Sequence, residues 1–235
     1  MYTTACSQIA RIIFGMSGYN RDKSKIYRGT AFAIQPNTLV TTAHSLHTEE
    51  NLKMPLLETV QVHNVTAHTT HKAKIIIENA EIDTAILKIE EPFVKMKNYA
   101  ILDEEIKPIG SDCGVLGYPL SIAHADPQTK EIHYQFIERF KGAHISASRP
   151  WQLPSGKWST IYELDIAPYP GSSGSPVFLS NEKVIGMLTE TKYSLFLHAM
   201  EVSRNTIDEF FITTFSTFIS SRDIRSFALE NGIAI

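Results

Sequence analysis

Residues 170–178, PGSSGSPVF, place a serine in the surroundings that a serine nucleophile needs. Small residues on both sides of Ser173 let the backbone turn tightly and leave the hydroxyl exposed. Gly171 frees a main-chain N–H to point into the same space. The N–H groups of Gly171 and Ser173 could then stabilise the oxyanion that forms when the hydroxyl attacks a carbonyl. A plain loop of Ser, Gly and Pro has the same composition, so the interpretation depends on what else the chain supplies.

A serine nucleophile needs a neighbouring base, and the base needs a carboxylate that orients it. Of the nine histidines, His44 stands apart because it directly follows the apolar segment TLVTTA at 38–43. Asp83 comes directly before a second apolar segment, TAILKI at 84–89, where a carboxylate can be half-buried and hydrogen-bonded to an imidazole. Taken singly, the two residues read as a histidine at a strand end and an aspartate that caps a turn.

The elements that must position these residues are short strands. Most apolar segments are rich in β-branched or aromatic residues and are separated by clusters of Gly, Pro, Asn and Asp, which favours an all-β sandwich or barrel. The C-terminus differs, because a serine at the N-cap, Asp223 in the first turn and Gly232 at the end predict a helix of about three turns. The predicted strands are 30–34, 38–43, 73–80, 84–89, 111–118, 132–140, 175–180 and 183–188.

Length and composition limit the classes of protein. The 235 residues allow one large domain or two small ones, and 43% hydrophobic with 20% charged residues excludes collagenous, disordered and coiled-coil chains. A net charge of −3 supplies no basic excess for nucleic acid, and no apolar run is long enough to span a membrane. The polar stretch 97–112 separates two strand-rich halves, which predicts domains at 1–105 and 106–235.

The N-terminus and the cysteines bear on the compartment. Residues 1–20 carry no basic residue before their apolar stretch, and Arg11 interrupts that stretch, so the segment reads as a first β-strand rather than a signal peptide. Cys6 and Cys113 are too few for a disulfide framework. We expect a cytoplasmic protein with free thiols; a single Cys6–Cys113 bridge and non-classical export stay open.

Taken together, the motifs TTAH (41–44), DTAILKI (83–89) and GSSGSPVF (171–178), in the order His, Asp, Ser, resemble the chymotrypsin-like (trypsin-fold) serine peptidases. The resemblance covers about residues 30–230 and is closest to glutamyl endopeptidases and high-temperature-requirement proteases. It implies two six-stranded antiparallel β-barrels and a C-terminal helix. The first barrel would carry the histidine and the aspartate and the second the serine, without a C-terminal peptide-binding (PDZ) domain.

The resemblance also implies a mechanism. Ser173 would attack a peptide carbonyl, His44 would accept its proton and later give it to the leaving amine, and Asp83 would hold the correct imidazole tautomer. The oxyanion hole would be formed by the N–H groups of Gly171 and Ser173. The partner is a protein or peptide substrate, the regulator is left open, and no metal or organic cofactor is implied.

Specificity is the least determined feature. By the resemblance, Ala167 lies at the specificity pocket, and the strand Leu188-Thr189-Glu190 pairs with the substrate main chain. No fixed acid at this pocket favours Lys or Arg, so the expected residue before the scissile bond is small or apolar. Either 192–202 or 212–220 forms the far wall of the pocket, and the other segment is an insertion.

One departure from digestive members concerns activation. Those members carry Asp immediately before the nucleophile, where it pairs with a new N-terminus after cleavage of the precursor. Here the position is Ser172, and no Ile-Val-Gly-Gly stretch lies near the N-terminus. We therefore expect no proteolytic activation of the trypsin type.

Other function classes remain open. The main alternative is a trypsin-fold binding module that has lost catalysis. An acyl hydrolase for small esters is disfavoured, because such enzymes alternate strands and helices and carry their residues in the order Ser, acid, His. His63, His68 and His71 invite a metal interpretation, but their spacing fits no helical HExxH or Cys/His zinc pattern, which favours a solvated strand or loop.

Overall fold

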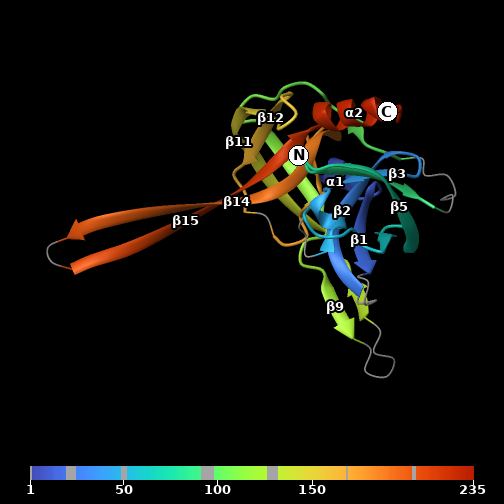
Figure 1. Cartoon of the computed structure of the whole chain (residues 1–235), viewed down its shortest axis with the longest axis horizontal. Coiled ribbons are helices and arrows are strands. Elements are labelled where there is room, and N and C mark those ends of the chain that lie inside the picture. The colour runs from blue at the N-terminus through green and yellow to red at the C-terminus, as the bar shows by residue number, and fades with distance from the viewer. Residues whose placement is uncertain are drawn as a thin grey trace.

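The structure is a computed structural model that describes residues 2–19, 25–48, 52–90, 98–125, 132–167, 169–202 and 205–235. Two antiparallel β-barrels lie side by side, and a helix follows the second barrel at the C-terminus (Figure 1). The predicted all-β class is therefore confirmed. No helix in the described ranges is long and apolar enough to cross a membrane.

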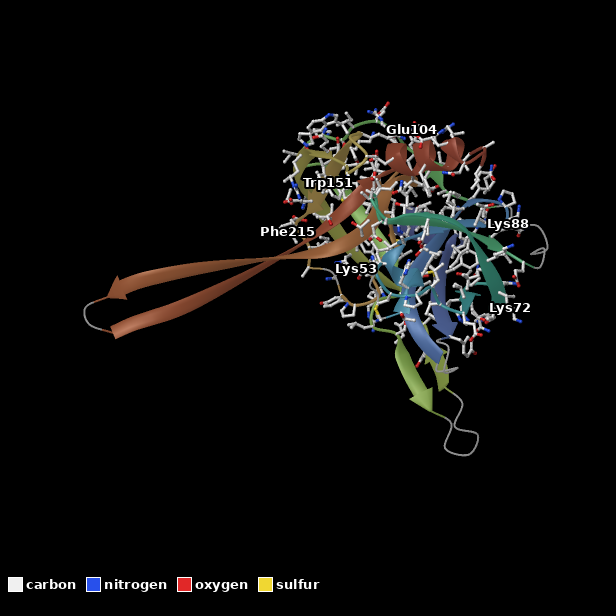
Figure 2. All side chains as sticks on the ribbon, in the orientation of Figure 1. Lys53, Lys72, Lys88, Glu104, Trp151 and Phe215 are labelled. Atoms are coloured by element: carbon white, nitrogen blue, oxygen red, sulfur yellow. The ribbon has the colours of Figure 1, made fainter. Side chains whose placement is uncertain are left out.

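The first barrel is a closed, six-stranded sheet in the order β1-β2-β3-β6-β5-β4. Apolar side chains turn inward, while Lys72 and Lys88 lie on the outer surface (Figure 2). A short 3-10 helix, His44–Leu46, follows the third strand. The strands are β1 Ile13–Tyr19, β2 Lys25–Gln35, β3 Thr38–Thr41, β4 Thr59–Asn64, β5 Thr69–Asn79 and β6 Thr84–Ile89.

The second barrel has the order β13-β8-β11-β12-β15-β14, and pairing between β13 and β14 closes it into six strands. The expected pair of six-stranded barrels is thereby confirmed. A parallel strand, β7 Ile101–Leu102, adds to β14, and a separate hairpin joins β9 Ile122–Ala125 to β10 Ile132–Gln135. The barrel strands are β8 Asp112–Gly117, β11 Arg139–Gln152, β12 Trp158–Leu164, β13 Pro176–Phe178, β14 Lys183–Val202 and β15 Asn205–Ser220.

The strand predicted for residues 1–20 is wrong for its first part. Thr3–Ile9 form a helix, α1, and the first strand begins only at Ile13. The reason is the position of the apolar residues: Ala5 and Ile9 are four apart, share one face of a helix and are both buried. The boundary at 105/106 stays a prediction; the strands of the first barrel end at Ile89.

The predicted C-terminal helix is confirmed as α2, Ser221–Glu230. Its N-cap is Ser220, whose hydroxyl accepts a hydrogen bond from the N–H of Asp223 at 3.1 Å. The helix buries Ile224 and Phe227, which belong to the same apolar cluster as the core of the first barrel. The helix thus packs on β14 and β15 of the second barrel and adds to an apolar cluster shared with the first.

The hairpin formed by β14 and β15 continues far beyond the second barrel (Figure 1). From Lys192↔Phe215 to Val202↔Asn205, the two strands pair only with each other. Residues 216–219 return to the barrel and pair with β12. We call the part of the hairpin beyond the barrel, residues 192–215, the projecting arm. The sequence left two candidates for the far wall of the specificity pocket. Residues 192–202 lie in the projecting arm, whereas the end of 212–220 lies in the wall of the second barrel.

Both cysteines are free thiols. Cys113 is buried on β8, and burial raises the pKa of its thiol to about 12. Cys6 is half-buried on α1. A thiol with so high a pKa is hardly ever a thiolate, so Cys113 is a packing residue rather than a nucleophile.

Candidate active site

The pairing of two strands brings His44 and Asp83 together. In the antiparallel β3–β6 pair, Thr41 lies opposite Ala85, so the end of one strand lies beside the start of the other. The main-chain N–H of His44 donates to Asp83 Oδ1 at 2.9 Å, and the ring Nδ1 lies 2.7 Å from Oδ2. One carboxylate therefore holds both the backbone and the ring of the histidine.

Asp83 adopts a backbone conformation that few residues tolerate. Its φ is 47°, in the left-handed region where Asp and Asn are enriched among non-glycine residues. Its carbonyl accepts a hydrogen bond from the Ala43 N–H at 3.2 Å. The side chains of His44 and Asp83 are only 20% and 22% exposed, so water screens their interaction weakly.

Ser173 lies opposite the other nitrogen of the imidazole. His44 Nε2 is 3.1 Å from Ser173 Oγ, which also lies 3.2 Å from the carbonyl oxygen of Thr189 on β14. The nucleophile loop, which we define as residues 169–175, is joined to β14 by two further bonds. Gly174 N–H donates to Leu188 O at 2.8 Å, and Leu188 N–H donates to Ser175 O at 2.9 Å. The structure thus brings the three predicted residues into one hydrogen-bonded series.

The first barrel also holds the nucleophile loop, through Thr30 on β2. The Thr30 N–H donates to Ser173 O at 3.0 Å, and its hydroxyl lies 3.4 Å from Gly171 O. Gly174 has φ +82°, and a Cβ there would lie 1.9 Å from Thr30 O. Sequence reasoning did not assign Thr30 a role. The one sequence feature that could have indicated this role is the segment RGTAFAI (28–34), in which Thr30 directly precedes the apolar residues 31–34.

The two N–H groups predicted for an oxyanion hole lie in a succession of tight turns. Gly171 has φ +87°, Ser172 N–H donates to Tyr169 O at 2.9 Å, and Ser175 N–H donates to Ser172 O at 3.0 Å. The Ser173 N–H donates to no atom of the described residues. It is therefore able to bond an external acceptor close to the Ser173 hydroxyl.

The predicted substrate-binding residues lie in different surroundings. Leu188 is 2% exposed, and both its main-chain polar groups bond the nucleophile loop. Thr189 is buried, and its hydroxyl donates to Thr217 O at 3.2 Å. Ala167 O accepts a hydrogen bond from Lys141 Nζ at 2.7 Å. Glu190 lies on β14, and its side chain is outside the described part of the chain, as is Pro168 beside Ala167.

A second His–Asp pair repeats the local geometry without a nucleophile. His144 N–H donates to Asp165 Oδ1 at 2.7 Å, and its Nδ1 lies 2.8 Å from Oδ2. Its Nε2 faces another carboxylate, Asp112, at 3.0 Å instead of a hydroxyl. The hydrogen bond and charge of Asp165 raise the pKa of His144 above its ordinary value. A His–Asp pair alone therefore does not define the site.

The histidines that raised the metal interpretation lie apart from this site. His63 is on β4, His68 is in the following turn and His71 is on β5. The ring nitrogens of His63 lie 2.8 Å from Ser17 Oγ and 2.9 Å from Thr70 Oγ1. In the described ranges, no three His, Cys, Asp or Glu side chains are grouped to hold a metal ion.

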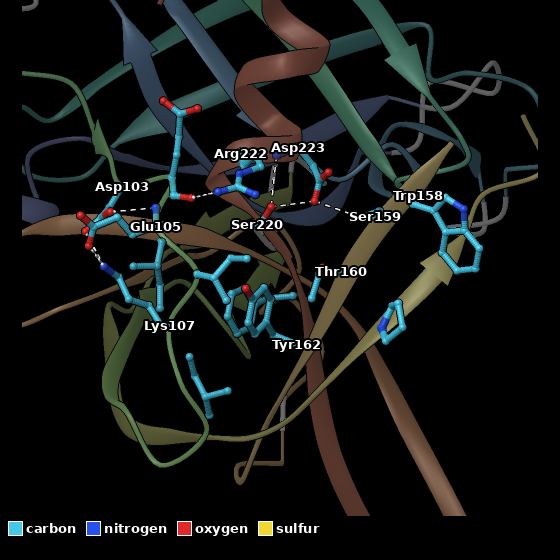
Figure 3. Close-up of a pocket in the computed structure, with 16 residues that line it drawn as sticks. Asp103, Glu105, Lys107, Trp158, Ser159, Thr160, Tyr162, Ser220, Arg222 and Asp223 are labelled. Atoms are coloured by element: carbon cyan, nitrogen blue, oxygen red, sulfur yellow. Dashed lines mark hydrogen bonds and ion pairs between the residues drawn. The ribbon is translucent and has the colours of Figure 1, made fainter. Parts of the chain in front are cut away.

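A pocket of about 290 Å³ lies beside the start of α2, and its lining includes none of the three predicted catalytic residues (Figure 3). Its polar groups are bonded to one another. Lys107 Nζ lies 3.0 Å from Asp103 Oδ2, and Asp223 Oδ2 accepts hydrogen bonds from Ser159 at 3.0 Å and Ser220 at 2.6 Å. This polar cluster joins α2 to β12, which is a structural role.

Comparisons with known proteins agree with the geometry. The profile of the trypsin-like peptidase domain matches residues 29–187. The active form of the Rv3671c protease from M. tuberculosis superimposes with a TM-score of 0.67 at 16% identity, over 96% of this chain and 82% of that one. The HtrA-type protease AlgW with tripeptide gives 0.66 at 17% identity, over 99% of this chain and 64% of the AlgW chain. No curated protein matches the sequence.

Proposed function

Since the chain belongs to the trypsin-like peptidase family, we propose that it hydrolyses peptide bonds through a triad of Ser173, His44 and Asp83 and an acyl-enzyme intermediate. The observation that carries this proposal is the series of contacts from hydroxyl to carboxylate. Ser173 Oγ lies 3.1 Å from His44 Nε2, and the opposite ring nitrogen lies 2.7 Å from Asp83 Oδ2. Both distances are within hydrogen-bond reach.

In the acylation step, Ser173 Oγ attacks the scissile carbonyl carbon while its proton passes to His44 Nε2. The tetrahedral intermediate collapses, the C–N bond breaks, and His44 gives the proton to the leaving amine. Water then attacks the acyl carbon while His44 takes its proton. The bond between the acyl carbon and Ser173 Oγ breaks, His44 returns the proton to Ser173, and the acid product leaves. Asp83 keeps the proton of the neutral ring on Nδ1, which leaves Nε2 free to accept, and it stabilises the imidazolium.

The oxyanion is stabilised by the N–H groups of Gly171 and Ser173. The absence of a bond from the Ser173 N–H to the described residues supports this role, as does the left-handed conformation of Gly171. Loss of one such donor costs on the order of 10²–10³-fold in turnover in a comparable protease. The bonds from Thr30 and Leu188 to the nucleophile loop hold these donors in place before substrate arrives.

Substrate binds along the strand after Leu188, beyond the last residue of β14 that pairs with β13. Both main-chain groups of Leu188 are already bonded, and Thr189 O lies 3.2 Å from Ser173 Oγ, so we assign the pairing with the substrate main chain to the Thr189 N–H and to Glu190. Such pairing supplies affinity without reading sequence. The residue before the scissile bond is small or apolar, because Ala167 supplies no charge at the pocket.

The intact chain is active without cleavage of its N-terminus. The Ser172 hydroxyl accepts a hydrogen bond from the Tyr169 N–H at 3.1 Å. The position that pairs with a new N-terminus in digestive members is thus bonded within its own loop, which supports a loop that is formed in the uncleaved chain.

A fluorophosphonate probe tests the proposal, because it reacts only with an activated serine. The intact chain should be labelled at one site, and Ser173→Ala should abolish labelling and peptide hydrolysis. The expected loss in turnover is on the order of 10⁶-fold, by analogy with a measured triad. If the folded chain is not labelled, it is instead the inactive trypsin-fold binding module.

A further inference from the structure

A second cavity, of about 230 Å³, lies behind the nucleophile loop, between that loop and the strands β8 and β11. Ser172, directly before the nucleophile Ser173, and Ser175, two positions after it, both line this cavity. Its lining includes none of His44, Asp83 and Ser173. The cavity therefore contacts the loop that carries the nucleophile without containing the reacting atoms.

Two positive charges line this cavity. Arg139 and Lys141 are two apart on β11, so they share one face of the strand, and both are half-buried. One Nη of Arg139 donates to the carbonyl of Pro119, and Lys141 Nζ donates to the carbonyl of Ala167 at 2.7 Å. Among the described residues, each side chain keeps further N–H donors beyond these bonds.

No negative charge balances them in the part of the chain that the structure describes. No Asp or Glu lines the cavity, and neither Arg139 nor Lys141 makes an ion pair with a described carboxylate. Lys141 Nζ lies 3.8 Å from the centre of the Tyr169 ring, an interaction that orients the ammonium but does not neutralise it. The cavity is therefore a favourable place for an anion.

A buried hydroxyl adds a further donor. Ser175 is 1% exposed, and its Oγ has no hydrogen-bond partner among the described residues. Gly117 makes room for it, since a Cβ there would lie 2.0 Å from Ser175 Oγ. Buried polar groups in folded proteins are nearly always bonded, so an unpaired hydroxyl at a cavity wall indicates an absent partner.

The remaining walls are largely apolar, with Val115, Ile166 and Leu188 among them. We propose that this cavity binds a small carboxylate on a short apolar stem, of which butyrate is the probe. The carboxylate accepts hydrogen bonds from Arg139 and Lys141, and the stem packs on the apolar wall. Inorganic anions satisfy only the charged half of this site. Neutral alcohols satisfy only the apolar half, and alkylamines, which are protonated near pH 7, are repelled by the two positive charges.

Binding should be coupled to the nucleophile. The ligand contacts Ser172, Ser175 and Tyr169 of the loop that holds Ser173, and a ligand that binds one conformation stabilises it. Saturating butyrate should therefore slow hydrogen exchange of the nucleophile loop by about 5-fold or more, because a ligand that binds the closed loop opposes its opening.

Calorimetric titration of the 235-residue Ser173→Ala chain with butyrate tests binding independently of activity, because Ser173 does not line the cavity. We expect saturable binding of one butyrate, with weaker binding of chloride and none of butylamine or butanol at equal ionic strength. Lys141→Met and Arg139→Met should each weaken butyrate binding about 10-fold or more, as expected for loss of a charged hydrogen bond.

Two further variants complete the test. Lys157→Met removes an exposed lysine that pairs with Glu230 at 2.8 Å, away from the cavity, and should leave binding unchanged. Ser175→Ala keeps both positive charges and should weaken binding about 3-fold or more. If thermal melting shows that Lys141→Met and Arg139→Met do not fold, the affinity of Ser175→Ala for butyrate tests the site in their place.

The proposal is overturned if the chain binds no butyrate, if chloride or butylamine binds as well as butyrate, or if the cavity variants bind like Lys157→Met. Binding without slower hydrogen exchange in the nucleophile loop overturns the coupling alone. A chain that binds butyrate but is never labelled contradicts the proposed function and leaves the carboxylate site standing.

Discussion

The main-chain N–H of Thr30, on a strand of the first barrel, donates to the carbonyl of Ser173 in the second barrel at 3.0 Å. The Thr30 hydroxyl also accepts a hydrogen bond from the Tyr118 N–H at 3.0 Å and lies 3.4 Å from Gly171 O. A single buried residue thus holds the loop that carries the nucleophile against the barrel that carries His44 and Asp83.

Replacing Thr30 with alanine should destabilise the chain and slow catalysis. Thr30→Ala keeps the main-chain bond to Ser173 but removes the buried acceptor of the Tyr118 N–H, which costs on the order of 1–3 kcal/mol. Denaturant unfolding measures the cost, and the labelling rate reports the loop. Thr30→Ser retains the hydroxyl and should restore most of both; an alanine variant as stable as wild type contradicts the role.

Replacing Asp83 with asparagine should leave the fold intact and nearly abolish turnover. The amide favours the wrong imidazole tautomer, and the comparable change in a serine protease triad lowers turnover on the order of 10⁴-fold. Peptide hydrolysis measures the loss. Asp165→Asn makes the same change in the second His–Asp pair and should leave turnover unchanged. Equal losses in both variants would show that the site has been misassigned.

Replacing Gly174 with alanine should displace the nucleophile loop. The new Cβ would lie 1.9 Å from Thr30 O, and the residue would also be held at φ +82°. Gly156→Ala is the matched control, because Gly156 has φ +84° and open space around it. The control should lose only about 1–2 kcal/mol from the left-handed backbone. Gly174→Ala should lose more stability, and its labelling should be strongly reduced.

The pKa of His144 should lie above 6.5, the ordinary value, because the hydrogen bond and charge of Asp165 favour the imidazolium. Since the folded state then binds the proton more tightly than the unfolded state, the stabilising contribution is complete below pH 6.5. It is lost as the pH rises through the folded pKa. NMR titration of the imidazole measures this directly. Asp165→Asn should lower the pKa, and an ordinary pKa in the parent chain contradicts the pairing.

Excising the projecting arm should leave the barrels folded. In the variant, Asn-Gly replaces residues 193–214 and joins Lys192 to Phe215, which are opposite each other in the hairpin. The thermal midpoint should change by only a few degrees and labelling should persist, because no barrel pairing involves the removed residues. A cleavage profile of both chains shows whether the arm selects substrate; an unfolded variant refutes the separation.

Local patterns predicted those features that arise within a few residues of chain. The serine between small residues, the histidine after one strand and the aspartate before another were identifiable because their signals are turns and strand ends. The C-terminal helix was identifiable for the same reason, since an N-cap serine and its hydrogen bond to Asp223 involve neighbouring residues. The helix α1 was missed because only two buried residues, Ala5 and Ile9, mark its apolar face.

The amino-acid sequence by itself determined which residues could form a serine-peptidase site and the order in which they occur. Only the tertiary structure decided how they meet. The β3–β6 pairing sets His44 against Asp83, and barrel contacts set Thr30 against Ser173. The tertiary structure also distinguishes His44 from His144, although each histidine pairs with an aspartate through Nδ1. The Nε2 of His44 lies beside the Ser173 hydroxyl, whereas the Nε2 of His144 lies beside a second carboxylate, that of Asp112. Such contacts join residues far apart in the chain, and they form because two closed barrels bury their apolar faces.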